Sequence, residues 1–156
     1  MSLFEPSEIF QFAIRIEQNG ENFYRKMAEK LDDKPLQDLF ISLADEEVKH
    51  KKIYQNMVSE IESYEPFESY SGEYYEYLRA YADNIVFDEE KLDDKIAAIS
   101  DKLSAIDFAI DNEISSILYY QEIKNLVPKG KHAQIDKIIE EERKHFARLT
   151  KIKKSV

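Results

Sequence analysis

The sequence predicts an all-α protein: a four-helix bundle with a long crossover between its second and third helices, and a short extra helix within that crossover. Only 3 Gly and 4 Pro occur among 156 residues, and 35% of residues are charged, a composition typical of long helices. Apolar residues recur at alternating steps of three and four along four segments. Polar residues interrupt this pattern at matching places in the two halves of the chain.

The composition also excludes several classes of function. Without Cys, the chain cannot form disulfides, thiolate metal sites or iron–sulfur clusters. A formal net charge of −10 disfavours nucleic acid, which binds basic surfaces. No apolar run reaches the length of a membrane span, and the N-terminus lacks the pattern of a signal peptide. We therefore expect a single cytoplasmic domain over residues 1–156 that binds neither nucleic acid nor membrane.

The first helix hairpin is expected over about residues 5–61. Its first helix begins near Pro6, because proline is tolerated in the first turn of a helix. That helix ends at the turn sequence Asp32–Pro35. The second helix starts there, with Asp33 as the expected N-cap, and its apolar pattern continues to Ile61.

The crossover is expected over about residues 62–99. Residues 64–72 are rich in turn-forming types and are predicted to be a loop. Glu73–Phe87 is predicted to form a short amphipathic helix, and the acidic segment Asp88–Asp94 is predicted to form another turn. The tyrosines of residues 64–81 are expected to cover the surface of the bundle or of a dimer. A connection of this length can run the whole length of a bundle.

The second hairpin is expected over about residues 100–152. Its first helix starts somewhere within residues 90–101 and runs to about Val127. Pro128 then ends it. The last helix continues to about Lys151.

Two Glu-x-x-His motifs lie on the apolar seams of these helices. Glu47 and His50 share one seam, and Glu142 and His145 share another. Residues three apart lie on one face of a helix, so each pair can point at one metal ion. The seam of the first pair comprises Leu36, Phe40, Leu43, Glu47, His50, Tyr54, Met57 and Ile61.

The other two helices carry a matching pair of glutamates. Glu17 is followed seven residues later by Tyr24, and Glu113 is followed at the same spacing by Tyr120. In both halves the pattern is Ala-Ile-x-x-Glu, with two residues between the Ala-Ile pair and the glutamate. The two hairpins therefore form an internal repeat, and a pseudo-twofold relation between them would bring the two Glu-x-x-His motifs face to face.

Six side chains are thus candidate ligands of two metal ions: Glu17, Glu47, His50, Glu113, Glu142 and His145. Four buried carboxylates would repel one another without cations. Two divalent ions would neutralise them, each with one imidazole, and carboxylates from two helices would bridge. Imidazole favours Fe or Mn over Mg, and Zn can also bind. Their core positions argue against the alternative that they are solvated helix-surface residues.

Three neighbouring residues could support these ligands. Tyr24 and Tyr120 could hydrogen-bond them or relay electrons, although plain core packing explains them equally well. Asp111 could hydrogen-bond a ligand histidine or could simply be solvated. The remaining glutamates beside the motifs are expected to face solvent: Glu46, Glu140 and Glu141.

At these residues the sequence resembles the ferritin-like superfamily, and within it the rubrerythrin-like di-iron proteins. The resemblance covers both hairpins and rests on Glu17 with Tyr24, on Glu47-x-x-His50 and on their equivalents in the second half. It implies a ferritin-like four-helix bundle with a left-handed crossover and two Fe ions. It also implies oxidation of Fe(II) by peroxide or O₂. We expect a homodimer.

The sequence departs from the rubrerythrin pattern in two respects. Rubrerythrins usually carry a second glutamate three residues after the ligand equivalent to Glu113, and here Ser116 occupies that position. The resemblance therefore does not imply the metal-shifting peroxidase cycle associated with that glutamate. Full-length rubrerythrins also carry a four-cysteine rubredoxin domain that supplies electrons. This sequence has no cysteine, so we expect an external electron-donor protein.

Several functions remain open on the sequence alone. The first is an oxidoreductase that reduces hydrogen peroxide or O₂ at two irons. The second is an iron-binding or storage protein, which predicts a large oligomer with many irons per chain. The third is a structural or regulatory bundle with a vestigial site. A di-manganese catalase is a further alternative, and it would need no electron donor.

Overall fold

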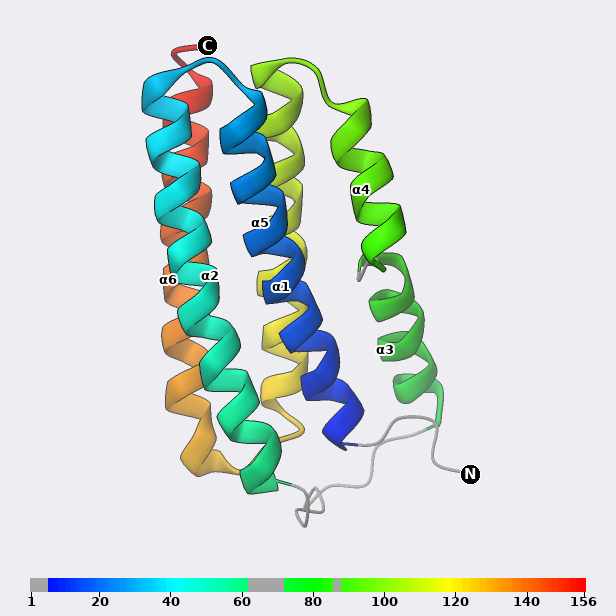
Figure 1. Cartoon of the computed structure of the whole chain (residues 1–156). Coiled ribbons are helices and arrows are strands. Elements are labelled where there is room, and N and C mark those ends of the chain that lie inside the picture. Colours follow the sequence, from blue (N-terminus) through cyan, green and yellow to red (C-terminus); the bar gives the residue numbers. More distant parts are fainter. Residues whose placement is uncertain (1–5, 62–71, 86–87) are drawn as a thin grey trace.

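The computed structural model describes residues 6–61, 72–85 and 88–156, and within these ranges it contains six helices and no strand. The helices are α1 (Pro6–Lys30), α2 (Lys34–Ile61), α3 (Gly72–Ile85), α4 (Glu89–Ala98), α5 (Lys102–Lys124) and α6 (Lys129–Lys153). The four long ones, α1, α2, α5 and α6, stand side by side as a bundle (Figure 1). This confirms the predicted fold class. No helix in the described ranges is long and apolar enough to cross a membrane.

Two helix hairpins make up the bundle. α1 packs along α2 and α5 along α6, and the hairpins meet where α1 contacts α5 and where α2 contacts α6. Asp33 caps α2 as predicted, because its side chain accepts a hydrogen bond from the Leu36 amide at 3.0 Å. Asp101 caps α5 in the same way, accepting from the Ser104 amide at 2.8 Å.

The crossover climbs from one end of the bundle to the other through two helices rather than one (Figure 1). α3 packs on α5, and α4 packs on α1. The sequence correctly predicts α3. The predicted loop of residues 64–72 lies outside the described residues except for Gly72, the first residue of α3.

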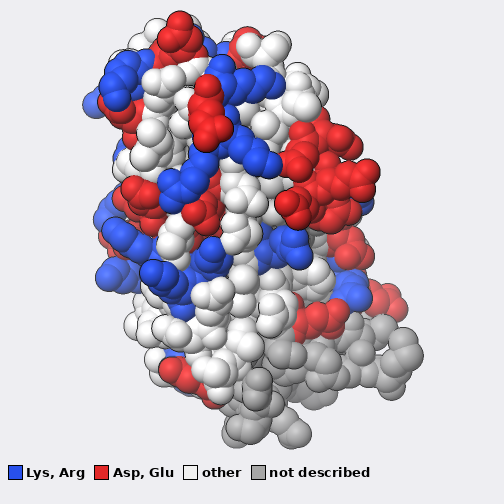
Figure 2. All heavy atoms as spheres, viewed as in Figure 1, with Lys and Arg blue, Asp and Glu red and all other residues white. Residues whose placement is uncertain are grey.

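The predicted turn at Asp88–Asp94 is wrong, because these residues begin α4. Asp88 caps the helix by accepting a hydrogen bond from the Lys91 amide at 2.7 Å. Leu92 and Ile96, one turn apart, are buried. The acidic side chains between them face outward and gather in a patch over α4 (Figure 2). The acidic run is therefore the solvated face of an amphipathic helix.

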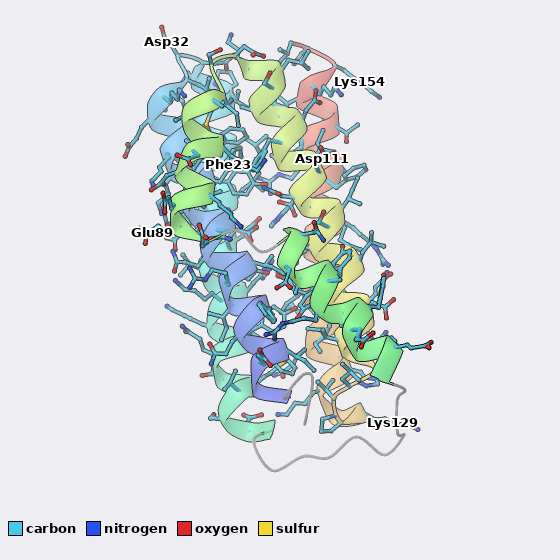
Figure 3. All side chains as sticks on the ribbon, turned by 90° about the vertical axis from the view of Figure 1, so that its right-hand side faces the viewer. Phe23, Asp32, Glu89, Asp111, Lys129 and Lys154 are labelled. Atoms are coloured by element: carbon cyan, nitrogen blue, oxygen red, sulfur yellow. The ribbon has the colours of Figure 1, made fainter. Side chains whose placement is uncertain are left out.

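Two apolar clusters fill the interior, and a polar layer lies among the same four helices. One cluster includes Ile9, Phe10, Tyr54, Tyr119 and Ile135. The other includes Phe23, Phe40, Leu43, Ala109 and Leu149, and Figure 3 shows Phe23 in the space between α4 and α5. Buried acidic and imidazole side chains between such clusters are costly unless they are paired or bind metal ions.

Candidate metal centre

The six predicted side chains meet in the middle of the bundle. α1 supplies Glu17 and α5 supplies Glu113, while α2 and α6 each supply one Glu-x-x-His pair. All six are at most 4% exposed. They form two groups of four, and within each group one potential ligand atom per residue lies within 4.8 Å of the others. The groups are Glu17, Glu47, His50 and Glu142, and Glu47, Glu113, Glu142 and His145.

Both histidines turn Nδ1 toward the carboxylates. Nδ1 of His50 lies 2.6 Å from Oε1 of Glu142 and 3.6 Å from Oε2 of Glu17. Nδ1 of His145 lies 3.3 Å from Oε1 of Glu47. The two rings are stacked at 5.8 Å between centroids. Glu47 and Glu142 belong to both groups, so each of these two carboxylates could serve both ions.

Every one of the six side chains keeps a buried atom that has no hydrogen-bond partner among the described residues. The atoms are Oε2 of Glu17, Oε1 of Glu47, Nδ1 of His50, Oε2 of Glu113, Oε1 of Glu142 and Nδ1 of His145. Some lie close together, but not with the alignment of a hydrogen bond. Leaving a buried polar atom unpaired costs about 1–3 kcal/mol, so six in one layer call for another partner. Nitrogen and carboxylate oxygen are ligands of Fe, Mn and Zn, and the donor set fits two such ions.

Glu47, Glu113 and Glu142 have strongly displaced pKa values without metal. Burial raises the pKa of Glu47 well above its ordinary value, and repulsion from Glu142 and Glu17 adds to this. Burial likewise raises the pKa of Glu113, with the charge of Glu142 as the next cause. Burial alone would also raise the pKa of Glu142, but its closeness to Glu113 and to the two histidines lowers it below its usual range. Protons must therefore replace part of the missing positive charge.

The pKa values of both histidines are raised, so the imidazoles favour their charged form. Burial alone would lower the pKa of His50, but Glu142 and Glu17 raise it to about 12. Glu113 and Glu142 overcome burial in the same way and raise the pKa of His145 to about 11. The metal-free site therefore favours positive charge, as a cation-binding site should.

A second pair of glutamates, which sequence reasoning assigned to solvent, holds the outer nitrogens of the histidines. Nε2 of His50 lies 2.6 Å from Oε2 of Glu141, and Nε2 of His145 contacts Oε2 of Glu46. The side chains of Glu46 and Glu141 are 34% and 36% exposed, whereas that of Glu140 is 65% exposed, as expected. A carboxylate on one ring nitrogen orients the imidazole and makes the other nitrogen a better metal ligand. The doubled glutamate of Glu-Glu-x-x-His was the available signal.

The two tyrosines reach across from one hairpin to the other. The Tyr24 hydroxyl donates to Oε1 of Glu113 at 2.5 Å, and the Tyr120 hydroxyl donates to Oε1 of Glu17 at 2.5 Å. Each bond leaves the Oε2 atom of its glutamate without a partner among the described residues. Each contact has its counterpart in the other half of the chain, as the pseudo-twofold relation requires.

Asp111 does not support a histidine. It lies exposed on α5 (Figure 3). Because residues of an α-helix follow one another at about 100°, a position two before Glu113 lies on the opposite side of α5 from the site. The contacts expected of Asp111 are made by Glu46 and Glu141 instead.

A small cavity of about 30 Å³ lies beside the site between α1 and α5. Its lining includes Gly20, Glu47, Glu113 and Ser116. A Cβ atom added at Gly20 would lie 3.0 Å from Oε2 of Glu47, so the glycine makes room for that carboxylate. The Ser116 hydroxyl donates to the carbonyl of Asn112 at 2.8 Å. A cavity of this size holds one or two molecules as small as water.

Comparisons with known proteins agree with this architecture. The family model described as Rubrerythrin matches residues 8–153, a span that contains all six side chains. A crystal structure from Thermotoga maritima, described as that of a ferritin-like diiron-carboxylate protein, is 27% identical in sequence. The alignment covers 97% of this chain and 95% of that chain, with a TM-score of 0.69. No curated protein matches the chain.

Proposed function

Because this chain belongs to the rubrerythrin family, we propose that it reduces hydrogen peroxide or O₂ at a pair of iron ions, with electrons from an external donor protein. One observation carries the proposal. Six buried side chains, each with an atom that has no hydrogen-bond partner within the described part of the chain, converge in two overlapping groups of four. Such an arrangement is expensive to fold unless two cations complete it.

The proposed ligands divide naturally between two ions. Glu47 and Glu142 would bridge, since both groups contain them. Glu17 and His50 would complete one ion's ligands, and the equivalent pair from the other half would complete the second. Mixed imidazole and carboxylate ligands suit Fe, and the likeness to a protein described as diiron supports that choice. When bound, the two irons would supply two electrons to one oxidant molecule.

The chain's own residues set the conditions for this reaction. Tyr24 and Tyr120 each hold one oxygen of a glutamate and so fix the direction of the other. The cavity of about 30 Å³ beside Gly20 has room for O₂ or peroxide but for little that is larger. Ser116 stands in its lining where rubrerythrins usually carry a glutamate, so the proposal includes no shift of a metal toward that position.

Metal content and an optical spectrum test the proposal. Protein purified with and without air should contain about two irons per chain, and the reduced form should change its spectrum on adding one equivalent of peroxide. Glu142→Gln should lose both ions, because that carboxylate serves both groups. Glu140→Gln, on the same helix with a 65% exposed side chain, should keep both.

Other results would indicate the alternatives. Absence of bound metal in the wild-type protein, or equal losses in both variants, would contradict the ligand assignment. Bound manganese with O₂ release from peroxide and no donor would indicate a catalase. Uptake of many irons per chain without turnover would indicate storage.

A further inference from the structure

Four tyrosine rings connect the candidate metal centre to the surface of α3. The centroids of Tyr120 and Tyr119 are 6.3 Å apart. Tyr119 is stacked on Tyr81, with centroids 6.1 Å apart and planes within 2°, and Tyr81 lies 6.2 Å from Tyr77. At the inner end, the Tyr120 hydroxyl bonds the proposed ligand Glu17. At the outer end, Tyr77 is 52% exposed.

The other half of the pseudo-twofold repeat has phenylalanine where this path has tyrosine. Tyr24 corresponds to Tyr120, and Phe23 corresponds to Tyr119. The aromatic neighbours of Tyr24 among the described residues are Phe23 at 5.5 Å and Phe40 at 5.3 Å. Phe23 is as buried as its counterpart. Packing at this position therefore does not require a hydroxyl group, and the tyrosines on one side call for another explanation.

Tyrosine differs from phenylalanine chiefly in that it can lose one electron together with its phenolic proton. Electron tunnelling between rings slows steeply with distance, and these rings are close neighbours. The hydroxyls of Tyr119 and Tyr81 donate to the carbonyls of Ile9 at 3.0 Å and Ser115 at 2.8 Å. A carbonyl does not keep the proton, so the positive charge only passes through these two rings, which their phenolic oxygens make easier to oxidise than a phenylalanine ring. Exposed Tyr77 can release its proton to water, which makes it the terminus.

We propose that Tyr120, Tyr119, Tyr81 and Tyr77 form a one-electron path to the metal centre. It supplies the second electron when peroxide meets a centre that holds only one. Peroxide then takes one electron from the centre, one from Tyr77 through the intervening rings, and two protons, and gives two water molecules. Tyr77 releases one proton to water and solvent supplies the other. The result is a neutral tyrosyl radical at the surface.

The radical at Tyr77 is repaired by a one-electron reductant, either a redox protein or a small molecule, together with a proton from water. The surface of α3 around Tyr77 is thus a place where an electron donor acts. The path rests on the proposed function, since it needs peroxide to react at the centre.

A fifth tyrosine offers a control. Tyr54 lies 5.0 Å from Tyr120, closer than the next ring of the path. It is fully buried, and its hydroxyl has no hydrogen-bond partner within the described ranges. Tyr54 does not connect Tyr120 to solvent, so replacing Tyr54 should leave the path from Tyr120 to Tyr77 intact.

Radical trapping tests the path on the full chain. Iron-loaded protein is reduced to one electron per site and mixed with one equivalent of peroxide and a nitroso spin trap, and the labelled residue is located by mass spectrometry. Wild-type protein and Tyr54→Phe should carry the label on Tyr77. Tyr119→Phe should reduce that label at least tenfold, while the optical change of the centre in the same samples keeps its rate.

Each result bears on a distinct claim. Undiminished labelling of Tyr77 in Tyr119→Phe would mean that diffusing radicals reach it, and this would overturn the path. Oxidation of the centre by peroxide with no label on Tyr77 would overturn the path and leave the proposed function standing. A centre that peroxide does not oxidise would overturn both. If Tyr119→Phe folds poorly, Tyr81→Phe, which changes a half-buried ring, should show the same loss of label.

Discussion

Replacing Gly20 by alanine should weaken metal binding without removing any proposed ligand. Gly20 lies in the middle of α1, facing Glu47. A Cβ atom there would lie 3.0 Å from Oε2 and 3.3 Å from Cδ of that side chain, whereas non-bonded heavy atoms prefer about 3.5–4.0 Å. Glu47 must therefore move by a few tenths of an ångström. Because it belongs to both groups of four, the displacement should affect both ions.

The size of the effect follows from two opposing contributions. Alanine stabilises a helix interior by about 0.5–1 kcal/mol relative to glycine. In the metal-free protein Glu47 is free to shift, so this gain should offset most of the crowding. With metal bound, a change that disturbs a ligand's support typically lowers affinity about 10–100-fold, or about 1.4–2.7 kcal/mol. For a chain of this length, that should reduce the metal-induced rise in melting temperature by roughly 3–10 °C.

Two measurements on three proteins test this reasoning. Iron affinity is obtained by competition with a chelator, and melting temperature is recorded with and without metal. Gly130→Ala is the control, because a Cβ atom at Gly130 in the first turn of α6 meets nothing within 4 Å and should leave metal binding unchanged. Wild-type affinity in Gly20→Ala would refute the argument. So would a loss of stability that is equally large in the metal-free protein.

The other predictions concern pH and the outer carboxylates. Burial raises the pKa of Glu47 and Glu113 in the metal-free fold, so protonation of these carboxyls stabilises that fold at low pH. This contribution to stability decreases as pH rises above about 4.5. The stabilisation from His50, whose pKa is raised to about 12, is complete below about pH 6.5 and is lost toward pH 12. The melting temperature of the metal-free protein should therefore decrease as pH is raised from about 6.5 to about 9. That of the metal-bound form should change less. A melting temperature of the metal-free form that increases over this pH range would contradict the prediction. Glu141→Ala should lower iron affinity about 10–100-fold in a chelator competition, whereas Glu140→Ala should not, and equal affinities would exclude a role for the outer carboxylate.

The six central side chains could be predicted from the sequence because the rule that places them is local. Glu47 and His50 occupy consecutive positions of an apolar seam, and a seam of a bundle helix must face the interior. The internal repeat then identifies Glu17 and Glu113 as equivalent positions. Polar residues at core positions conflict with packing unless they pair with something, so the conflict itself marks the site.

The supporting residues were harder to predict because their role depends on the neighbouring helix. Glu46 and Glu141 stand one position before a central glutamate, about 100° around their helices, where an isolated helix would face solvent. In the bundle that flank meets the histidine of the opposite hairpin. The acidic segment of α4 was misread for a related reason. Its charge suggested a turn, whereas the cap at Asp88 and the buried Leu92 determine the outcome.

The internal repeat gives Ser116 a counterpart in the first half of the chain, namely Gly20. Ser116 follows Glu113 by three residues, and Gly20 follows Glu17 by three. Both small residues line the cavity between α1 and α5, so the two halves of the chain keep the same place open. A glutamate at Ser116 would fill part of this cavity and leave less space for a small molecule. The departure from the usual family pattern therefore gives α5 the small residue that α1 has at the matching position, and it leaves space beside the site in place of an additional ligand.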